Sequence, residues 1–245
     1  MRQHHCMYHK TKGIVLHTIK YSETSVIAKI YTEKLGLVSY IVKGVRSAKS
    51  TSKAALLQPL TLLEMEVMHR ENKQLQYIKE FRRDYVYRSI PFDTLKSTVA
   101  IFLLELISKS IREHEQNSEM FEFIYESLCV LDKSESLNPD FHLLFLVHFS
   151  RHLGFVPHGN FSEKNAFFEM TEGMFIAQQS EINVMSKAES RILNELLLAN
   201  PFSSATLQIS RQERKQMLGN LVRYYQLHLE NFSLKSPEIL EAILD

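Results

Sequence analysis

The chain has 245 residues, a formal net charge of +1 and 44% hydrophobic residues, enough for one large or two ordinary domains with real cores. Only two cysteines occur, Cys6 and Cys129, which excludes a disulfide framework and indicates a reducing compartment. The first residues lack the apolar core of a signal peptide, and no stretch reaches the roughly 18 uncharged apolar residues of a membrane span. We therefore expect a soluble, cytoplasmic protein with no membrane partner.

Residues 1–9 are predicted to be a disordered extension, with Met7 as an alternative start, and residues 10–88 carry the pattern of short β-strands. β-Branched residues dominate the first two runs, and Gly36 supplies the positive φ that a tight reversal needs. Five short strands joined by tight turns predict a barrel of the OB type. The strands are expected at residues 13–19, 25–31, 37–42, 63–67 and 75–81.

Residues 89–245 are predicted to form a mainly α-helical domain, because from Pro91 the apolar residues recur at spacings of three and four. An irregular segment near residues 155–185 interrupts it, with a hairpin expected around Glu172-Gly173. The predicted fold class is thus a two-domain α+β chain, a five-stranded barrel followed by helices. Helices are expected over about 95–107, 121–131 and 138–153, from the capping boxes Ser186–Glu189 and Ser210–Glu213, and from Ser236.

The two predicted domains differ in charge. Residues 10–90 contain 15 Lys and Arg against 7 Asp and Glu, a balance of +8, whereas residues 91–245 contain 13 against 21, a balance of −8. Such asymmetry indicates that the barrel meets a polyanion and the helical domain does not. The alternative is that two solvated surfaces simply differ.

Signatures of catalysis are missing from the sequence. The seven glycines are isolated, so neither a Walker A loop nor a dinucleotide fingerprint occurs. Lys43-Gly44-Val45-Arg46 is similar to the lysine motif of nucleic-acid ligases, but those need an acidic residue where Val45 stands. Cys129 lies on an apolar helix face, as an inert core thiol does. We predict that the protein is not an enzyme and has no catalytic residues.

Three histidines, His148, His152 and His158, are the candidates for a metal site. His148 and His152 share a helix face, but Phe149 stands where a zinc protease carries its glutamate, and no cysteine lies nearby. A structural or surface histidine pair is the favoured interpretation. No metal ligand is predicted.

The stretch KGVRSAKSTSK, residues 43–53, has four cations and no anion between two apolar runs. Cations of this kind neutralise phosphates without regard to base sequence, and aromatic side chains on an OB barrel stack on bases. Tyr31 and Phe81 are favoured as core residues, while Tyr21 and Tyr40 fit core or stacking equally. The candidate nucleic-acid contacts are Lys43, Arg46, Lys49, Lys53, Lys20, Arg70, Lys73, Arg82, Arg83, Tyr21 and Tyr40.

Several short motifs keep the order and spacing of a known family. The chain resembles RecO, the bacterial DNA repair and recombination mediator, over nearly its whole length from Met7. The likeness is specific in the first 60 residues and looser in the helices. It is carried by GIVLHT at 13–18, YSETS at 21–25, YTEKLG at 31–36, VKGVRS at 42–47, LQP at 57–59, HLGF at 152–155 and LENFSLKS at 229–236.

The resemblance implies a non-enzymatic protein that binds single- and double-stranded DNA and anneals complementary strands. With RecR it would help to load RecA onto strands covered by single-strand binding protein (SSB), in the bacterial cytoplasm at the nucleoid. The family's KGxR stretch belongs to the DNA-binding surface, which places Lys43 and Arg46 there, with Lys49 and Lys53 nearby. The family fold, an OB barrel and a helical domain, agrees with the pattern of elements.

The chain departs from the family at one site. Many RecO proteins carry four cysteines after the HLG motif as a zinc-finger-like site, and here residues 154–179 contain none. We therefore expect no zinc and no other cofactor. Aromatic packing is predicted to hold this segment instead, by Phe161, Phe167, Phe168 and Phe175.

The family also binds the acidic, Phe-ending tail of SSB. An apolar notch with local cations on the helical domain is needed for this. Two sets of candidates fit: Lys109 with Arg112, or Arg211 with Arg214 and Lys215.

Two other functions stay open from the residues alone. One is a scaffold whose barrel grips an acidic protein, which would give no mobility shift with oligonucleotides. The other is an RNA-binding OB protein, which would not accelerate the annealing of complementary DNA strands.

Overall fold

The structure, a computed structural model, describes residues 7–45, 51–70, 73–112, 116–178 and 182–244. The chain divides into two compact units, residues 1–88 with 111–125, and residues 89–110 with 126–245. The first unit therefore includes part of a helix that the sequence pattern places wholly in the helical domain.

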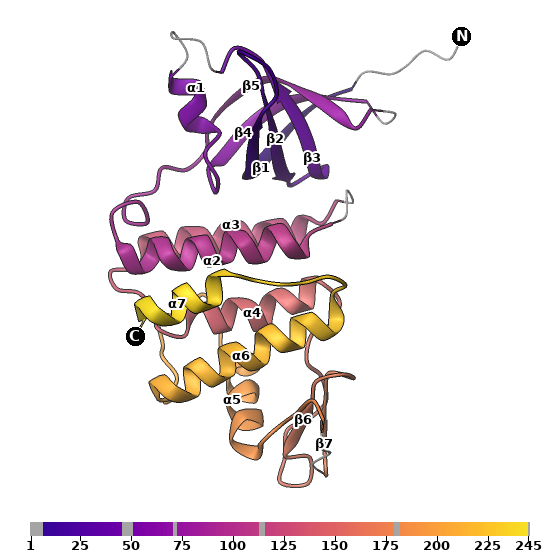
Figure 1. Cartoon of the computed structure of the whole chain (residues 1–245), viewed down its shortest axis with the longest axis vertical. Coiled ribbons are helices and arrows are strands. Elements are labelled where there is room, and N and C mark those ends of the chain that lie inside the picture. The colour runs from indigo at the N-terminus through magenta and orange to yellow at the C-terminus, as the bar shows by residue number, and fades with distance from the viewer. Residues whose placement is uncertain (1–6, 46–50, 71–72, 113–115, 179–181, 245) are drawn as a thin grey trace, which may run out of the picture. The chain divides into compact units, whose positions relative to one another are not determined.

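Five antiparallel and parallel strand pairings close the first unit into a barrel with the strand order β1-β2-β3-β5-β4 (Figure 1). This confirms the predicted OB-type architecture. The observed strands extend beyond the predicted ones at most ends. They are β1 (Met7–Lys20), β2 (Val26–Thr32), β3 (Gly36–Val42), β4 (Leu62–His69) and β5 (Leu75–Arg83).

Strand β1 is long because it pairs with two neighbours in succession. Its first half pairs with β4 and its second half with β2, and the register shifts between Val15 and His17. A Cβ at Gly13 would lie 2.6 Å from Met65 Cε and 2.7 Å from Ile30 Cγ2, so glycine permits the close packing there. Met7–His9, assigned from the sequence to the extension, instead begin β1 opposite His69–Val67, while residues 1–6 lie outside the described part.

A short helix, α1 (Thr51–Leu56), connects β3 to β4 beside the barrel (Figure 1) and was not predicted from the sequence. Ala54 and Leu56 pack against the barrel core, which also contains Val45 and Leu57. The ends of the basic stretch are thus anchored by apolar contacts, and its middle, residues 46–50, is not among the described residues.

Tyr40 is fully buried in this core, and its hydroxyl forms no hydrogen bond to any described residue. Burial raises the pKa of the Tyr40 phenol. Because an unpaired buried hydroxyl is destabilising, we expect Tyr40→Phe to raise the free energy of unfolding by about 1 kcal/mol. Urea denaturation measures the change, and a loss of stability would show that the hydroxyl has a partner.

The N-terminal half of α3 (Ser118–Lys133) packs against the barrel within the first unit. The Tyr31 hydroxyl donates to the Asn117 carbonyl at 3.2 Å, and the Tyr31 and Phe121 rings are 6.0 Å apart. Tyr31 is 0% exposed, which agrees with its predicted place in the core.

Helices dominate the second unit, whose α7 lies beside α2 and α6 (Figure 1). Both predicted capping boxes are present: Ser186 with Glu189 at the start of α5 and Ser210 with Glu213 at the start of α6. The helices are α2 (Thr94–Ser110), α4 (Phe141–His152), α5 (Lys187–Leu198), α6 (Arg211–His228) and α7 (Ser236–Leu244).

A three-stranded sheet follows α4, in the order β7-β6-β8. Gly173, with φ 69°, turns the chain between β6 (Phe167–Glu169) and β7 (Met174–Ile176), at the position where the sequence predicts a hairpin, and β8 (Val184–Met185) completes the sheet. Phe168 and Phe175 pack 5.1 Å apart, and Phe161 lies 5.7 Å from Phe175.

Candidate nucleic-acid interface

The outer surface of the barrel has two faces that differ in how their charges are paired. We call the first the cationic face; it is formed by side chains that point outward from the end of β1, from β2, from β3 and from the start of β5. Its strand stretches, residues 17–20, 26–32, 36–43 and 73–77, contain no Asp or Glu. The cationic face comprises His17, Ile19, Ile27, Lys29, Ser39, Ile41, Lys43, Leu75 and Tyr77.

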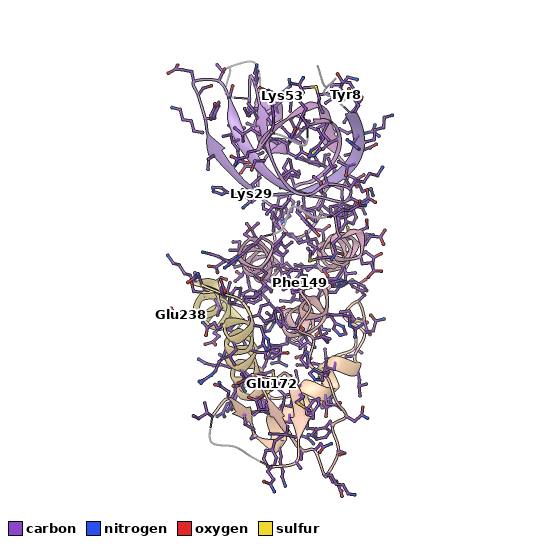
Figure 2. The ribbon with its side chains drawn as sticks, turned by 90° about the vertical axis from the view of Figure 1, so that its right-hand side faces the viewer. Tyr8, Lys29, Lys53, Phe149, Glu172 and Glu238 are labelled. Carbon is purple, nitrogen blue, oxygen red and sulfur yellow. The ribbon has the colours of Figure 1, made fainter. Side chains whose placement is uncertain are left out.

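The register of the strands orders the cationic face into rows. Ile19 pairs with Ile27, Ile27 with Ile41, and Ile41 with Tyr77, so these four form an apolar row across the strands. His17, Lys29, Ser39 and Leu75 form the next row by the same pairings. Lys29 lies at the surface of the barrel (Figure 2), and the Lys43 ammonium lies 5.8 Å from the centre of the Tyr77 ring.

We call the second surface the paired face; it comprises Lys10, Lys12, Glu64, Glu66, Lys79, Glu80, Arg82 and Asp84. Here the cations contact carboxylates. Arg82 Nε lies 2.8 Å from Glu64 Oε2, and Lys79 Nζ lies 2.9 Å from Glu66 Oε1. Lys12 Nζ lies 3.1 Å from Asp84 Oδ2. The Lys79 ammonium lowers the pKa of Glu66, which keeps that carboxylate ionised. The positive electrostatic potential of these cations is therefore largely cancelled by the carboxylates of the same face.

Several predicted contacts lie on or beside the cationic face. Lys20 ends β1 and pairs with Val26, which also pairs with Val42, so Lys20 and Lys43 stand at the same end of β1 and β3, the two strands that flank β2. Tyr21, in the loop after Lys20, is 56% exposed. The Thr18 hydroxyl donates to the Leu57 carbonyl at 2.9 Å, which brings the end of α1, and with it exposed Lys53 (Figure 2), alongside β1.

The remaining predicted residues are more scattered. Arg70 and Lys73 bracket the β4–β5 loop, whose backbone is held by Gln76 Nε2, which donates to the Arg70 carbonyl at 2.7 Å. Arg83 is exposed at the end of β5, and Arg82 belongs to the paired face. Tyr40 has no accessible ring face, so we assign it to the core in place of the stacking role. Arg46 and Lys49 lie outside the described residues.

The structure also brings in residues that the sequence interpretation missed. Tyr77 and Lys29 face outward beside Lys43, and the three isoleucines of the apolar row are at least partly exposed. Alternation along β2 and β3 indicates that each strand has two faces. Both faces are apolar or mixed in character, so only the pairing register of the strands decides which face points outward.

The second unit carries a cavity of about 30 Å³ between α4, α6 and α7. Arg214 Nε donates to Asp140 Oδ1 at 2.8 Å, and Lys215 Nζ lies 3.0 Å from Glu241. Of the predicted tail-binding residues, Arg211, Arg214 and Lys215 meet at this cavity, whereas Lys109 and Arg112 lie exposed at the C-terminal end of α2. The lining comprises His142, Arg211, Arg214, Lys215, Leu218, Leu240 and Glu241.

His142 lines the cavity, and the centre of its ring lies 6.4 Å from that of the Phe102 ring. Burial, aided by the charge of Arg214, lowers the pKa of His142 to about 3. A histidine in the unfolded chain has a pKa near 6.5. The stabilisation that comes from keeping His142 neutral is therefore fully present above about pH 6.5, and the free energy of unfolding falls by about 1.4 kcal/mol per pH unit as the pH drops toward 3. Between pH 7 and 5 we expect wild type to lose about 2 kcal/mol more than His142→Phe in urea denaturation. Equal losses in the two proteins would contradict this.

Models of known families match both units of the chain. The description "Recombination protein O N terminal" matches residues 7–83, and "Recombination protein O C terminal" matches residues 91–238. The chain belongs to the RecO family. RecO proteins are DNA repair proteins, so the match assigns the chain, with its barrel and its helical unit, to DNA repair.

Relatives named DNA repair protein RecO match this RecO chain over nearly its full length. That of Phocaeicola vulgatus is 38% identical, over 97% of this chain and 99% of its own. The protein of Bacteroides fragilis is 36% identical over 98% and 100%, and that of Flavobacterium psychrophilum is 37% identical over 96% and 97%. The resemblance read from the short motifs is confirmed.

Among the described residues, no group of three or more His, Cys, Asp or Glu side chains is placed to hold a metal ion, so the candidates His148, His152 and His158 form no such group. The His148 ring lies 3.2 Å from the Leu196 carbonyl, and its pKa is lowered chiefly by burial. No described helix has both the length and the apolar character needed to cross a bilayer.

Proposed function

We propose that this RecO chain binds single- and double-stranded DNA through the cationic face and the basic segments beside it, and anneals complementary strands. With RecR it helps to load RecA onto SSB-coated single strands in the bacterial cytoplasm, at the nucleoid, and catalyses no reaction itself. The observation that carries the DNA-binding part is the unequal pairing of charge. Cations on the cationic face have no carboxylate beside them in their strands, while those of the paired face are bound to glutamates.

This arrangement suits a polyphosphate. A phosphate that approaches the cationic face displaces only counterions, whereas one that approaches the paired face must also oppose glutamate carboxylates. Phosphate contacts carry no base preference, as an annealing protein requires, because it must accept strands of any sequence.

Strand annealing with and without SSB tests the proposal. We expect the chain to accelerate the annealing of complementary oligonucleotides, followed by loss of donor fluorescence, and to do so on SSB-coated strands as well. If the complementary strands anneal no faster with the protein than without it, the proposal is overturned. Tight binding to RNA without DNA annealing would support the RNA-binding alternative.

We further propose that the SSB tail binds at the mouth of the cavity between α4, α6 and α7. Arg211 and Lys215 would contact its carboxylates, and Leu218 and Leu240 its terminal phenyl ring. An apolar cavity that holds benzene measures on the order of 150 Å³, far more than the 30 Å³ present. The ring therefore enters only if α7 moves away from α6.

The tail site is tested with a fluorescent acidic peptide that ends in Phe. We expect Arg211→Glu with Lys215→Glu to weaken its binding by roughly tenfold, because two ion pairs are lost. The control is Lys109→Glu with Arg112→Glu, the other predicted pair, which should bind the peptide normally. The reverse pattern would move the site to α2.

We propose that the segment after α4 needs no zinc or other cofactor. Its packing supports this, since Phe155 stacks on the His228 ring at 5.0 Å and the Tyr224 hydroxyl donates to the Phe155 carbonyl at 2.5 Å. Of the predicted aromatics, Phe161, Phe168 and Phe175 join this cluster, and Phe167 lies under Lys187. We expect EDTA to leave the melting temperature unchanged, and a fall of several degrees would indicate a bound metal.

A further inference from the structure

We propose that α7 is a displaceable lid on the acidic-tail site, and that it occupies this site with its own side chains until a tail peptide takes their place. The inference rests on the tail site proposed above and specifies how access to that site is regulated. It starts from the position of α7, the last helix of the chain (Figure 1). Two of its residues, Leu240 and Glu241, line the cavity that the phenyl ring would have to enter.

Leu240 and Glu241 supply the same chemical groups as the proposed ligand. Leu240 is 0% exposed and lines the cavity together with Leu218 of α6. Glu241 places a carboxylate 3.0 Å from Lys215 Nζ, where a carboxylate of the tail would bind. An acidic peptide that ends in Phe presents the same pair of groups, an apolar side chain and a carboxylate. With α7 in place, the lysine is therefore paired and the apolar space is filled before any peptide arrives.

The docked position of α7 is supported by few side-chain contacts. The helix has nine residues, and helices of this length are marginal unless other parts of the protein hold them. Of its apolar side chains that the structure describes, Leu240 alone is buried, whereas Ile239 is 57% and Ile243 37% exposed. The pair of Lys215 with Glu241 is partly exposed and contributes little. Displacing α7 therefore exposes one large apolar side chain of the helix.

The N-terminus of α7 is fixed by a carboxylate from another helix, Glu105 of α2. This carboxylate accepts hydrogen bonds from the Ser236 amide at 2.8 Å, from the Lys235 amide at 2.9 Å, and from the Ser236 hydroxyl. Burial opposes the ionisation of Glu105, but the hydrogen bonds outweigh it and lower the pKa of the carboxyl. A carboxylate at a helix N-terminus also complements the helix dipole. We call Glu105 and its three donors the latch of the lid.

The segment before α7 is anchored independently of the helix. The Phe232 side chain is 6% exposed, and the centre of its ring lies 5.5 Å from that of Tyr225 in α6. Only residues 233–235 lie between this anchor and the first residue of α7. When the latch opens, α7 can therefore move away while the chain up to Phe232 stays packed.

The test compares Glu105→Ala, which removes the latch, with Glu238→Ala, which removes the same charge from an exposed position on α7 (Figure 2). A fluorescent acidic peptide that ends in Phe is titrated and followed by anisotropy. The measured affinity is the intrinsic affinity multiplied by the fraction of molecules whose lid is open. We expect Glu105→Ala to bind the peptide about tenfold more tightly than wild type, which corresponds to an open fraction of about a tenth in wild type. Glu238→Ala should stay within about twofold of wild type, because solvent and salt screen an exposed charge.

Hydrogen exchange of the unmodified protein gives a second test that does not depend on the folding of any variant. When the peptide binds, the amides of α7 should exchange faster, because a helix of nine residues frays once it leaves its place. The amides of α6 should exchange more slowly. Slower exchange in α7 with the peptide bound would show that the helix closes over the peptide, and it would overturn the lid.

The affinities separate failure of the lid from failure of the tail site. Equal affinity of Glu105→Ala and wild type would overturn the lid and leave the tail site in place. An equal gain for Glu105→Ala and Glu238→Ala would also overturn the lid, since the removal of any negative charge would then suffice. If Arg211→Glu with Lys215→Glu binds the peptide as wild type does, the tail site itself is wrong, and the lid is overturned with it.

Discussion

Replacing Asp140 by alanine is expected to lower the free energy of unfolding by about 3–5 kcal/mol. The carboxylate is 0% exposed; its Oδ1 accepts from Arg214 Nε and its Oδ2 from the Leu207 amide, each at 2.8 Å. Alanine leaves a largely buried guanidinium without its counter-charge and an amide without its acceptor. Such uncompensated groups cost far more than the ion pair contributes.

Urea denaturation followed by circular dichroism measures the loss. The control is Glu195→Ala, which removes an exposed pair in which Arg191 Nε lies 3.9 Å from the carboxylate, and which should change stability by less than about 0.5 kcal/mol. Asp140→Asn should fall between the two, since it keeps an acceptor. If Asp140→Ala loses no more than the control, the pair is not a structural element and Arg214 is available to bind a partner.

Replacing Lys20, Lys43 and Lys53 together by alanine is expected to weaken binding to single-stranded DNA by about a hundredfold in 0.1 M salt. Each phosphate contact contributes about 0.7 to the slope of log K against log salt for a single strand. Three lost contacts lower the slope by about 2, and at 0.1 M salt this equals about two decades in affinity.

The matched control removes three cations of the paired face, Lys10, Lys79 and Arg82. We expect this triple variant to lose less than about threefold, because each of these cations lies beside Glu64 or Glu66, whose carboxylates offset its attraction for phosphate. Both triple variants change exposed side chains and should melt like wild type. Similar losses in the two would mean that net charge, and not the cationic face with the lysines beside it, governs DNA binding.

Much of the fold follows from local patterns. Strand alternation, the Gly36 turn and the Ser–Glu capping boxes are decided by residues a few positions apart, and all appear in the structure. The exception is α1, whose six residues include Thr51 and Ser52 and are too short to show a helical period. Its packing against the barrel core, and not its own propensity, supports it.

The site was harder to predict, because its properties depend on residues far apart in sequence. Tyr40 and Tyr77 both lie in strands, and only the register and closure of the barrel put one inside and the other outside. The pairing of Arg82 with Glu64 joins neighbouring strands, and that of Arg214 with Asp140 joins α6 to the start of α4. A count of cations in the sequence cannot distinguish those that are paired with a carboxylate from those that can bind a phosphate.

Protection of lysines from acetylation, with and without single-stranded DNA, tests the central claim most directly. Mass spectrometry would follow each lysine of the unmodified protein. The account predicts strong protection of Lys20, Lys29, Lys43 and Lys53, with Lys10 and Lys79 modified at the same rate in both states. Protection of Lys10 and Lys79 while Lys29 and Lys43 stay reactive would place DNA on the paired face and contradict the account.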